Sequence, residues 1–179
     1  MFNTEPIHKI EIVWEGPLTI KDAKAKGDSK FDYGLYQIYG THPVYGANSL
    51  LYIGKSDRNV FRYRMESHER DWIPDVPSEV NVYLGYFAGE SATPPCDEDW
   101  SRDIGYAERL MIYCCQPSFN VREKYLKPTF EKEILVLNFG KRHQLPAVFS
   151  SLILRDEKKR LNKWAWAEKI IPTASDESI

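Results

Sequence analysis

Hydrophobic and polar residues alternate over several short segments of the chain, and between them apolar residues recur every three or four positions. Alternation is typical of strands with one buried face, and the longer period is typical of amphipathic helices. Strands are therefore expected at residues 10–14, 34–39, 50–53, 80–88 and 131–139. Helices are expected at residues 20–26, 59–72, 101–115 and 147–171. This order of elements predicts an α+β fold with a small antiparallel β-sheet flanked by helices.

Turn-forming residues set the expected ends of some of these elements. Gly16-Pro17 is expected to end the first strand. Residues 34–39 and 50–53 are expected to pair through a long hairpin loop at residues 40–49, which contains two glycines and a proline. Regular alternation of strands and helices, which would indicate a parallel sheet, is not evident.

The composition is that of an ordinary globular protein, with 42% hydrophobic and 28% charged residues. No apolar run approaches the roughly 20 residues that a membrane-spanning helix needs, and residues 1–9 are too polar for a secretory signal. A cytoplasmic location without a membrane partner is therefore expected. The cysteines, Cys96, Cys114 and Cys115, lack C-x-x-C spacing, which supports neither a disulfide framework nor a zinc site.

Charge is distributed unevenly along the chain. The formal net charge is −2, whereas domains that bind nucleic acid are usually basic because phosphate contacts dominate their affinity. Basic residues nevertheless gather at residues 55–70, 122–127 and 158–163. Such runs are compatible with a nucleic-acid contact and with an ordinary solvated face, so charge alone favours neither.

One expected helix carries a carboxylate within an apolar stripe. Ile104, Ala107, Met111 and Cys115 fall on one helical face, and Glu108 lies on the same face. Burying a carboxylate is costly unless it is paired or holds a cation. A bound cation, a buried salt bridge to an arginine, or an edge position that reaches water would each account for Glu108.

The helix expected before it carries a second polar pair. Its apolar face holds four residues: Phe61, Met65, His68 and Trp72. Arg64, at the edge of that face, lies four residues before His68, so the two side chains project together. An arginine can hold a phosphate through its planar fork, and a histidine one turn away can transfer a proton. An exposed pair beside the core would give the same spacing.

These residues follow the order of a known nuclease family. The tripeptides at residues 34–36 (Gly-Leu-Tyr) and 52–54 (Tyr-Ile-Gly) resemble the two signatures of the GIY-YIG nucleases, with Leu35 in place of the usual isoleucine. In that family the paired strands precede a helix with an arginine and, in many members, a histidine four residues later. A glutamate on a later helix and an asparagine on a following turn complete the set. The matching positions are Gly34, Tyr36, Tyr52, Gly54, Arg64, His68, Glu108 and Asn120.

The resemblance covers residues 33–125, about half of the chain. It implies a GIY-YIG-like catalytic core at residues 31–128. The other expected segments are an N-terminal extension packed on the core at residues 1–30, a C-terminal strand and helix at residues 129–172, and a disordered tail at residues 173–179. These ends have no counterpart in the minimal catalytic module of the family.

The resemblance implies a metal-dependent endonuclease that hydrolyses DNA phosphodiester bonds. Glu108 would bind one Mg²⁺ or Mn²⁺ ion per active site, which also explains a carboxylate in an apolar stripe. Arg64 would hold a non-bridging phosphate oxygen. Tyr36 would orient or deprotonate the attacking water. His68 or Lys55 would supply the nearby base or cation that a phenol needs to act at neutral pH.

Supporting roles are implied for the other matching residues. Tyr52 is a rival base or a second phosphate contact, although aromatic packing on the sheet would equally explain it. Asn120 would brace the site through hydrogen bonds. Gly34 and Gly54 would let another backbone or a phosphate approach the strands, or would serve turns. Contacts to DNA are expected from the basic residues Lys55, Arg58, Arg62, Lys158, Lys159 and Arg160.

The expected partner is double-stranded DNA, with structured DNA or RNA also compatible with these residues. A double-strand cut needs two active sites, as in a homodimer, or two sequential nicks. Two alternatives stay open: a non-cleaving nucleic-acid-binding module of the same fold, and an unrelated interaction domain that docks through Trp164 and Trp166. Among the restriction, homing, repair and mobile-element members of the family, the compact chain favours a stand-alone, restriction-like enzyme.

Overall fold

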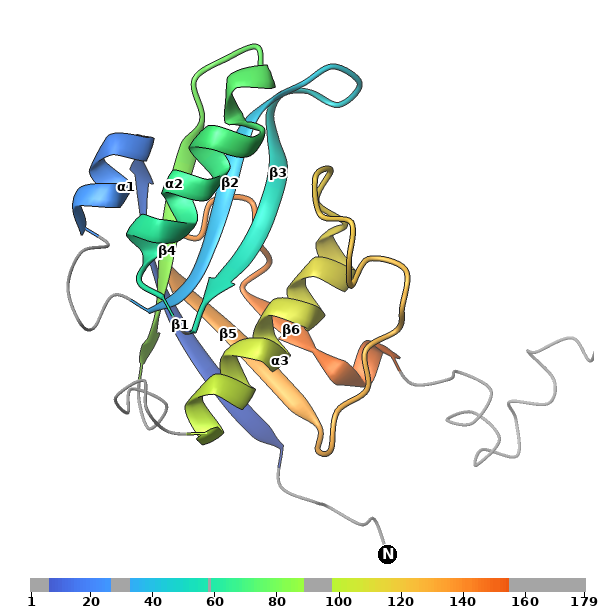
Figure 1. The fold of residues 1–179 in the computed structure, drawn as a ribbon. Helices are drawn as coiled ribbons and strands as arrows, with labels where there is room; N and C mark the ends of the chain where they lie inside the picture. The colour runs from blue at the N-terminus through green and yellow to red at the C-terminus, as the bar shows by residue number, and fades with distance from the viewer. Residues whose placement is uncertain (1–6, 27–32, 58, 89–97, 155–179) are drawn as a thin grey trace, which may run out of the picture.

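Three helices pack against one β-sheet in the computed structural model, which describes residues 7–26, 33–57, 59–88 and 98–154 (Figure 1). The helices are α1 (Ile20–Lys26), α2 (Phe61–Asp71) and α3 (Glu98–Cys115). The strands are β1 (His8–Leu18), β2 (Gly34–His42), β3 (Gly46–Ser56), β4 (Asn81–Ala88), β5 (Ile134–Gly140) and β6 (Val148–Ser150). Single 3₁₀ turns follow α2 and β6, at Ile73–Asp75 and Ser151–Leu154. The architecture is therefore α+β, as the sequence predicts.

The strands follow the order β3-β2-β4-β1-β5-β6 across the sheet. β1 and β5 pair in parallel, whereas the other neighbours are antiparallel. The expectation of an antiparallel sheet is therefore wrong for this pair. A parallel pair needs a long crossover, and the one between β1 and β5 contains most of the chain, so no local pattern indicates it. β1 occupies a central position in the sheet; the division into core and extensions stays a prediction.

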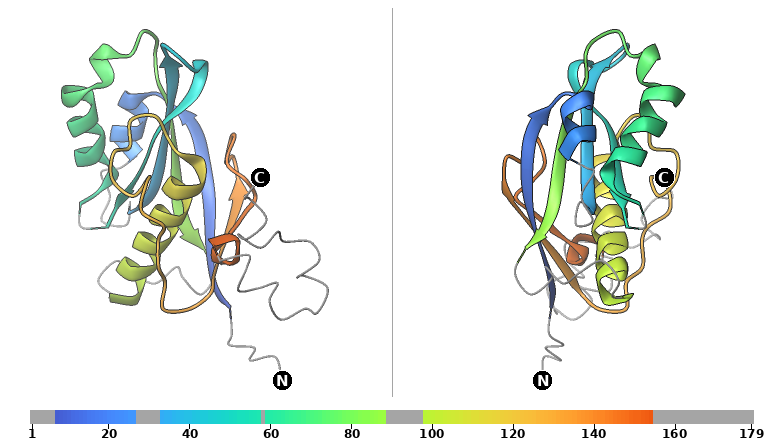
Figure 2. Two further views of the ribbon diagram at one scale, coloured as in Figure 1. Left: turned by 90° about the vertical axis from the view of Figure 1, so that its right-hand side faces the viewer. Right: turned by 60° about the vertical axis from the view of Figure 1, so that its left-hand side comes forward.

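Alternate residues of β2 face two hydrophobic clusters on opposite sides of the sheet. Tyr36 and Ile38 belong to the cluster beneath α1 and α2. Leu35 and Tyr39 belong to the cluster beneath α3. α1 and α2 lie side by side, and α3 contacts both edge strands, β3 and β6, so the sheet curls around α3 (Figures 1 and 2). The edge strand β3 consequently lies between α2 and α3.

The first strand is longer than the sequence pattern predicts. β1 continues through Gly16-Pro17, and its pairing with β4 changes register between Glu15 and Leu18. A proline lacks the N–H that a regular ladder uses, and an irregularity in register accommodates it. The expectation that Gly16-Pro17 ends this strand is therefore wrong.

The β2–β3 hairpin is also longer than expected, and its loop is shorter. Pairing extends to His42 and Gly46, so residues 43–45 alone connect the strands rather than residues 40–49. Gly40 lies within β2 because the site is crowded: an added Cβ would lie 2.8 Å from the Leu51 side chain. The expected long loop is therefore wrong, since glycine serves close packing there.

The remaining elements agree with the sequence except at the C-terminal end. α1, α2, α3, β4 and β5 lie where helices and strands are expected, within a few residues, and α3 begins three residues earlier. The expected helix at residues 147–171 is wrong in its described part, because Val148–Ser150 forms the edge strand β6. Phe149 is buried while Val148 is half exposed, which is the alternation of a strand. Residues 155–171, with Trp164 and Trp166, lie outside the described residues.

No helix in the described ranges is long and apolar enough to cross a membrane. Cys114 and Cys115 are free thiols at the end of α3, and burial raises the pKa of the Cys115 thiol to about 12. A thiol with so high a pKa is unreactive at neutral pH. Cys96 lies outside the described residues.

Candidate active site

Two tyrosines from neighbouring strands begin a polar cluster between the sheet and α2. Tyr36 of β2 is fully buried and stacks on Tyr52 of β3, with the ring centroids 6.0 Å apart. The Tyr36 hydroxyl lies over Gly54, where an added Cβ would come within 2.4 Å of the hydroxyl oxygen. Gly54 therefore makes room for a side chain of the protein itself.

Gly34 has a different task. Its φ is +155°, and an added Cβ would lie 2.1 Å from the carbonyl oxygen of Gly85 on β4. Any other residue would clash with this backbone. The sequence left three explanations for Gly34: approach of another backbone, approach of a phosphate, or a turn. The close approach of the β4 backbone accounts for it.

α2 directs Arg64 and His68 toward the same hydroxyl group. The Arg64 Nε–H donates to Tyr36 Oη over 3.3 Å. His68 Nε2 lies 2.8 Å from Tyr36 Oη. The i, i+4 spacing that is visible in the sequence thus brings both side chains to one oxygen atom.

Trp72 completes this group at the C-terminal end of α2. Its indole Nε1–H donates to His68 Nδ1 over 2.8 Å. The sequence indicates only an apolar role for Trp72, on the same helical face as His68. Its spacing of four residues from His68 is the signal that predicts contact between the two side chains.

The two titratable groups at the centre of this cluster are held neutral. Burial, and next the neighbouring Tyr52, raises the pKa of Tyr36 above its ordinary range, against a lowering effect of Arg64. Burial lowers the pKa of His68 to about 4, with a further contribution from the Arg64 charge. In the metal-free protein at neutral pH, Tyr36 is therefore a phenol and His68 an uncharged imidazole.

α3 brings Glu108 to the other side of the β3 edge. Glu108 Oε2 lies 4.0 Å from Lys55 Nζ, whereas Asp57 Oδ2 lies 3.0 Å from the same ammonium group. The Glu108 side chain is only 17% exposed. Burial raises the pKa of this carboxyl group to about 7, with Lys55 lowering it and Asp57 raising it. Among the described residues, Glu108 is thus a desolvated carboxylate whose ion-pair partner, Lys55, lies closer to Asp57.

Glu108 shares an electrostatic environment with the tyrosine cluster. Burial is the main cause that raises the pKa of Tyr36 and of Tyr52, and the Glu108 charge is among the further causes for both. Tyr36 first, and Glu108 among other groups, raise the pKa of Arg64. A charge placed between α2 and α3 would therefore interact electrostatically with residues on both helices.

The residues at Glu108 fit a hard divalent cation that keeps most of its water. Mg²⁺ takes oxygen ligands and is commonly bound by one or two carboxylates together with phosphate oxygens. Within the described ranges, no three His, Cys, Asp or Glu side chains are grouped to hold an ion. A single carboxylate, Glu108, would need water and phosphate oxygens to complete such a ligand set. A cation there would also offset the desolvation of this carboxylate.

Asn120 fixes the edge strand on which this site is built. Its Oδ1 accepts from the Ile53 main-chain N–H over 2.9 Å, and its Nδ2 donates to the Ile53 carbonyl over 2.8 Å. The preceding Ser118 and Phe119 donate main-chain N–H groups to β3 as well. Asn120 therefore satisfies backbone groups that an edge strand otherwise leaves open.

Replacing Asn120 with alanine is expected to lower the free energy of unfolding by roughly 2–3 kcal/mol, because both Ile53 main-chain groups would lose their partners in a buried position. Urea denaturation of the two proteins measures the difference. Asn138→Ala is the comparison variant for the loss of a buried asparagine side chain away from β3, since Asn138 is also buried and bonded to Trp14 and Pro146. Wild-type stability of Asn120→Ala would show that the edge needs no bracing.

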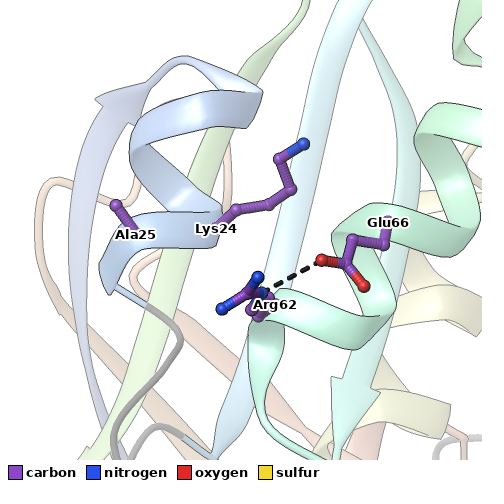
Figure 3. A pocket seen from close by; sticks show the side chains of 4 residues that line it. All are labelled: Lys24, Ala25, Arg62 and Glu66. Carbon is purple, nitrogen blue, oxygen red and sulfur yellow. Dashed lines mark hydrogen bonds and ion pairs between the residues drawn. The ribbon is translucent and has the colours of Figure 1, made fainter.

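Of the two expected DNA-contact residues that the structure describes, Lys55 and Arg62, only one joins this cluster. Lys55 does, through Asp57 and Glu108. Arg62 is exposed on α2, where its Nε lies 3.0 Å from Glu66 Oε1. It lines a cavity of about 250 Å³ with Lys24 and Ala25 of α1 (Figure 3). None of these lining residues contributes to the tyrosine cluster. Outside the described residues lie Arg58, Lys158, Lys159 and Arg160.

Comparison with known proteins yields one result. No protein-family model, curated protein or solved structure matches this chain. A proposal for its function therefore rests on the residues and chemistry of the site.

Proposed function

We propose that this chain is a DNA endonuclease of the GIY-YIG type that uses Mg²⁺ or Mn²⁺. The observation that carries the proposal is the approach of Arg64 and His68 to one buried hydroxyl group, that of Tyr36. A desolvated carboxylate, Glu108, shares the electrostatic environment of these residues. Phosphodiester hydrolysis needs an oriented water and stabilisation of charge on the phosphate, and a cation, a carboxylate and a phenol in one place can supply both.

Arg64 binds the scissile phosphate in this proposal. Its guanidinium is half-buried and hydrogen-bonds to the hydroxyl groups of Tyr36 and Tyr52, and a guanidinium has five N–H groups, so others remain for a non-bridging oxygen. The planar fork of an arginine suits two phosphate oxygens better than an ammonium group does. Lys55, held at Asp57, adds positive charge on the other side of the edge strand.

Tyr36 positions the attacking water. Because burial keeps it a phenol at neutral pH, its hydroxyl can orient a water molecule and can accept a proton only after releasing its own. The N–H groups of Arg64 and His68 would stabilise the phenolate oxygen. Tyr52, stacked on Tyr36 and hydrogen-bonded to Arg64, would be a second contact to the phosphate in this proposal.

Glu108 would hold the divalent ion in this proposal. A bound Mg²⁺ supplies neutralising charge for the phosphate and for the departing 3′-oxygen. In the overall reaction the water oxygen bonds to phosphorus as the bond to the 3′-oxygen breaks. The water loses one proton and the departing oxygen gains one. The products carry a 5′-phosphate and a 3′-hydroxyl.

The test is cleavage of a supercoiled plasmid by the purified protein in Mg²⁺ or Mn²⁺, with a chelator control and the Glu108→Ala variant. Nicking or linearisation that requires metal and disappears in Glu108→Ala is the expected result. Linear product without a nicked intermediate would indicate two active sites acting together, as in a homodimer. Equal cleavage by the wild type and Glu108→Ala would overturn the assignment of the site.

Cleavage assays combined with a gel shift separate the nuclease from a non-cleaving module of the same fold. A folded wild-type protein that shifts DNA in a gel at low salt, yet leaves supercoiled, linear and branched DNA intact with metal, would favour the non-cleaving module. A protein that neither shifts nor cuts nucleic acid would favour an interaction domain.

A further inference from the structure

Both nitrogens of one buried imidazole are engaged by neighbouring side chains. His68 Nε2 lies 2.8 Å from Tyr36 Oη, and His68 Nδ1 accepts from Trp72 Nε1 over 2.8 Å. His68 is 7% exposed, and its ring contacts those of Tyr36, Tyr52 and Trp72. Water therefore has little access to substitute for either partner.

The chemistry of the indole decides which nitrogen carries the proton. An indole N–H donates and never accepts, so Nδ1 must present its lone pair to Trp72. A neutral imidazole with a bare Nδ1 carries its hydrogen on Nε2. An imidazolium would set an Nδ1–H against the indole N–H. Burial, followed by the Arg64 charge, lowers the pKa of His68 to about 4, which agrees with a neutral ring.

Trp72 itself is fixed in place by packing from the sheet side. Its ring stands edge-on to Phe119, with the centroids 4.9 Å apart, and Phe119 donates its main-chain N–H to Leu51 of β3. The Trp72 main-chain N–H also donates to the His68 carbonyl, at the end of α2. The indole N–H is therefore aimed at His68 before any substrate arrives.

We propose that Trp72 is a positioning residue that holds His68 as the Nε2–H tautomer, so that His68 donates a hydrogen bond to Tyr36 and is not its base. This inference rests on the proposed function for its catalytic meaning. Tyr36 Oη then accepts from His68 and from Arg64, and its own hydrogen points away from both. The role of base to Tyr36 that the sequence suggests for His68 is replaced by that of a phenolate-stabilising donor.

The tautomer is measured directly by two-dimensional ¹⁵N–¹H NMR on protein labelled at histidine, without metal or DNA. The chain has four histidines, and His68→Gln assigns the signal by its loss. A protonated Nε2 and a lone-pair shift for Nδ1 in the wild type are expected at neutral pH. A protonated Nδ1 would overturn the inference, whether or not the protein cleaves DNA.

Trp72→Phe tests the indole N–H while keeping an aromatic ring. The His68 signals are expected to shift toward a mixture of the two tautomers, and kcat for cleavage to fall about ten- to hundredfold with little change in KM. Trp100→Phe is the control, because Trp100 is buried against Tyr33 away from the cluster. An unchanged tautomer in folded Trp72→Phe would overturn the role of Trp72. If the protein cuts no DNA but His68 is the Nε2–H tautomer, the nuclease proposal would be refuted and the inference about the tautomer would stand.

Discussion

Replacing Glu108 with glutamine is expected to stabilise the metal-free protein at alkaline pH and, in the same variant, to abolish metal-dependent cleavage. Both effects follow from one property, the burial of a carboxylate on α3 with its closest cation 4.0 Å away. Glutamine keeps the size of the side chain and removes its charge. It cannot supply the anionic oxygen that holds a divalent ion.

The sign of the stability effect follows from the raised pKa. Burial raises the pKa of Glu108 to about 7 in the folded protein, above its ordinary value of 4.5 in the unfolded chain. The protonated form is therefore favoured by folding. The contribution of protonated Glu108 to the stability of the folded protein is complete below the unfolded pKa, and it is lost as the pH rises through about 7. At about pH 8, Glu108→Gln should exceed the wild type by on the order of 2 kcal/mol, and at about pH 4.5 the two should differ little.

The activity effect is larger. A divalent ion at a developing phosphate charge is worth several kcal/mol, and each 1.4 kcal/mol is about a tenfold change in rate, so the loss should reach about a thousandfold. Urea denaturation at the two pH values and single-turnover plasmid cleavage measure both effects. Glu66→Gln is the control, because Glu66 is more exposed and pairs with Arg62 on α2. Full activity of Glu108→Gln would remove Glu108 from the mechanism.

The candidate site is built in part on an edge strand. β3 carries Tyr52, Gly54 and Lys55, and it has a strand neighbour on one side only, β2. Its other side is held by the segment after α3, through Asn120 and the main chain of Phe119. This segment links the edge to α3, the helix that carries Glu108. The chain thus connects the edge that carries Tyr52 to the helix that carries Glu108 through one set of hydrogen bonds.

The regular helices and strands could be predicted from the sequence because their buried residues recur periodically. α2 buries Phe61, Met65 and His68, which recur at helical spacing, and β1 buries alternate residues, as a strand does. The errors fall where pairing between strands, rather than the local period of apolar residues, decides. Gly16-Pro17 is tolerated in β1 because of a register change against β4, and β6 is only three residues long. Neither feature leaves a local pattern.

Part of the candidate site could be predicted from the sequence for a similar reason. Spacing alone brings Arg64 and His68 together, and an acidic residue in an apolar stripe draws attention to Glu108. The hydrogen bond from Trp72 was hidden, because a tryptophan on an apolar face is ordinarily core. The ion pair between Lys55 and Asp57 was hidden as well, since Asp57 lies in the bend just after β3, where no strand or helix spacing predicts a side-chain contact.

Replacing Tyr36 with phenylalanine is the second change expected to have a large effect on cleavage, a loss of about 10²–10⁴-fold in kcat. The variant keeps the ring that stacks on Tyr52 and packs against Phe61. It removes the oxygen that receives hydrogen bonds from Arg64 and His68 and that would orient the attacking water. Single-turnover cleavage under saturating DNA measures the chemical step.

Tyr39→Phe is the matched control for this change. Tyr39 lies on the same strand, is equally buried, and donates its hydroxyl to Gln37 Oε1 over 2.8 Å, but it faces the cluster beneath α3. Each variant loses buried hydrogen bonding worth about 1–3 kcal/mol of stability, so melting temperatures should fall by similar amounts. Cleavage should fall only in Tyr36→Phe. Equal loss of activity in both would trace the effect to stability, and near-normal cleavage by Tyr36→Phe would assign Tyr36 to packing alone.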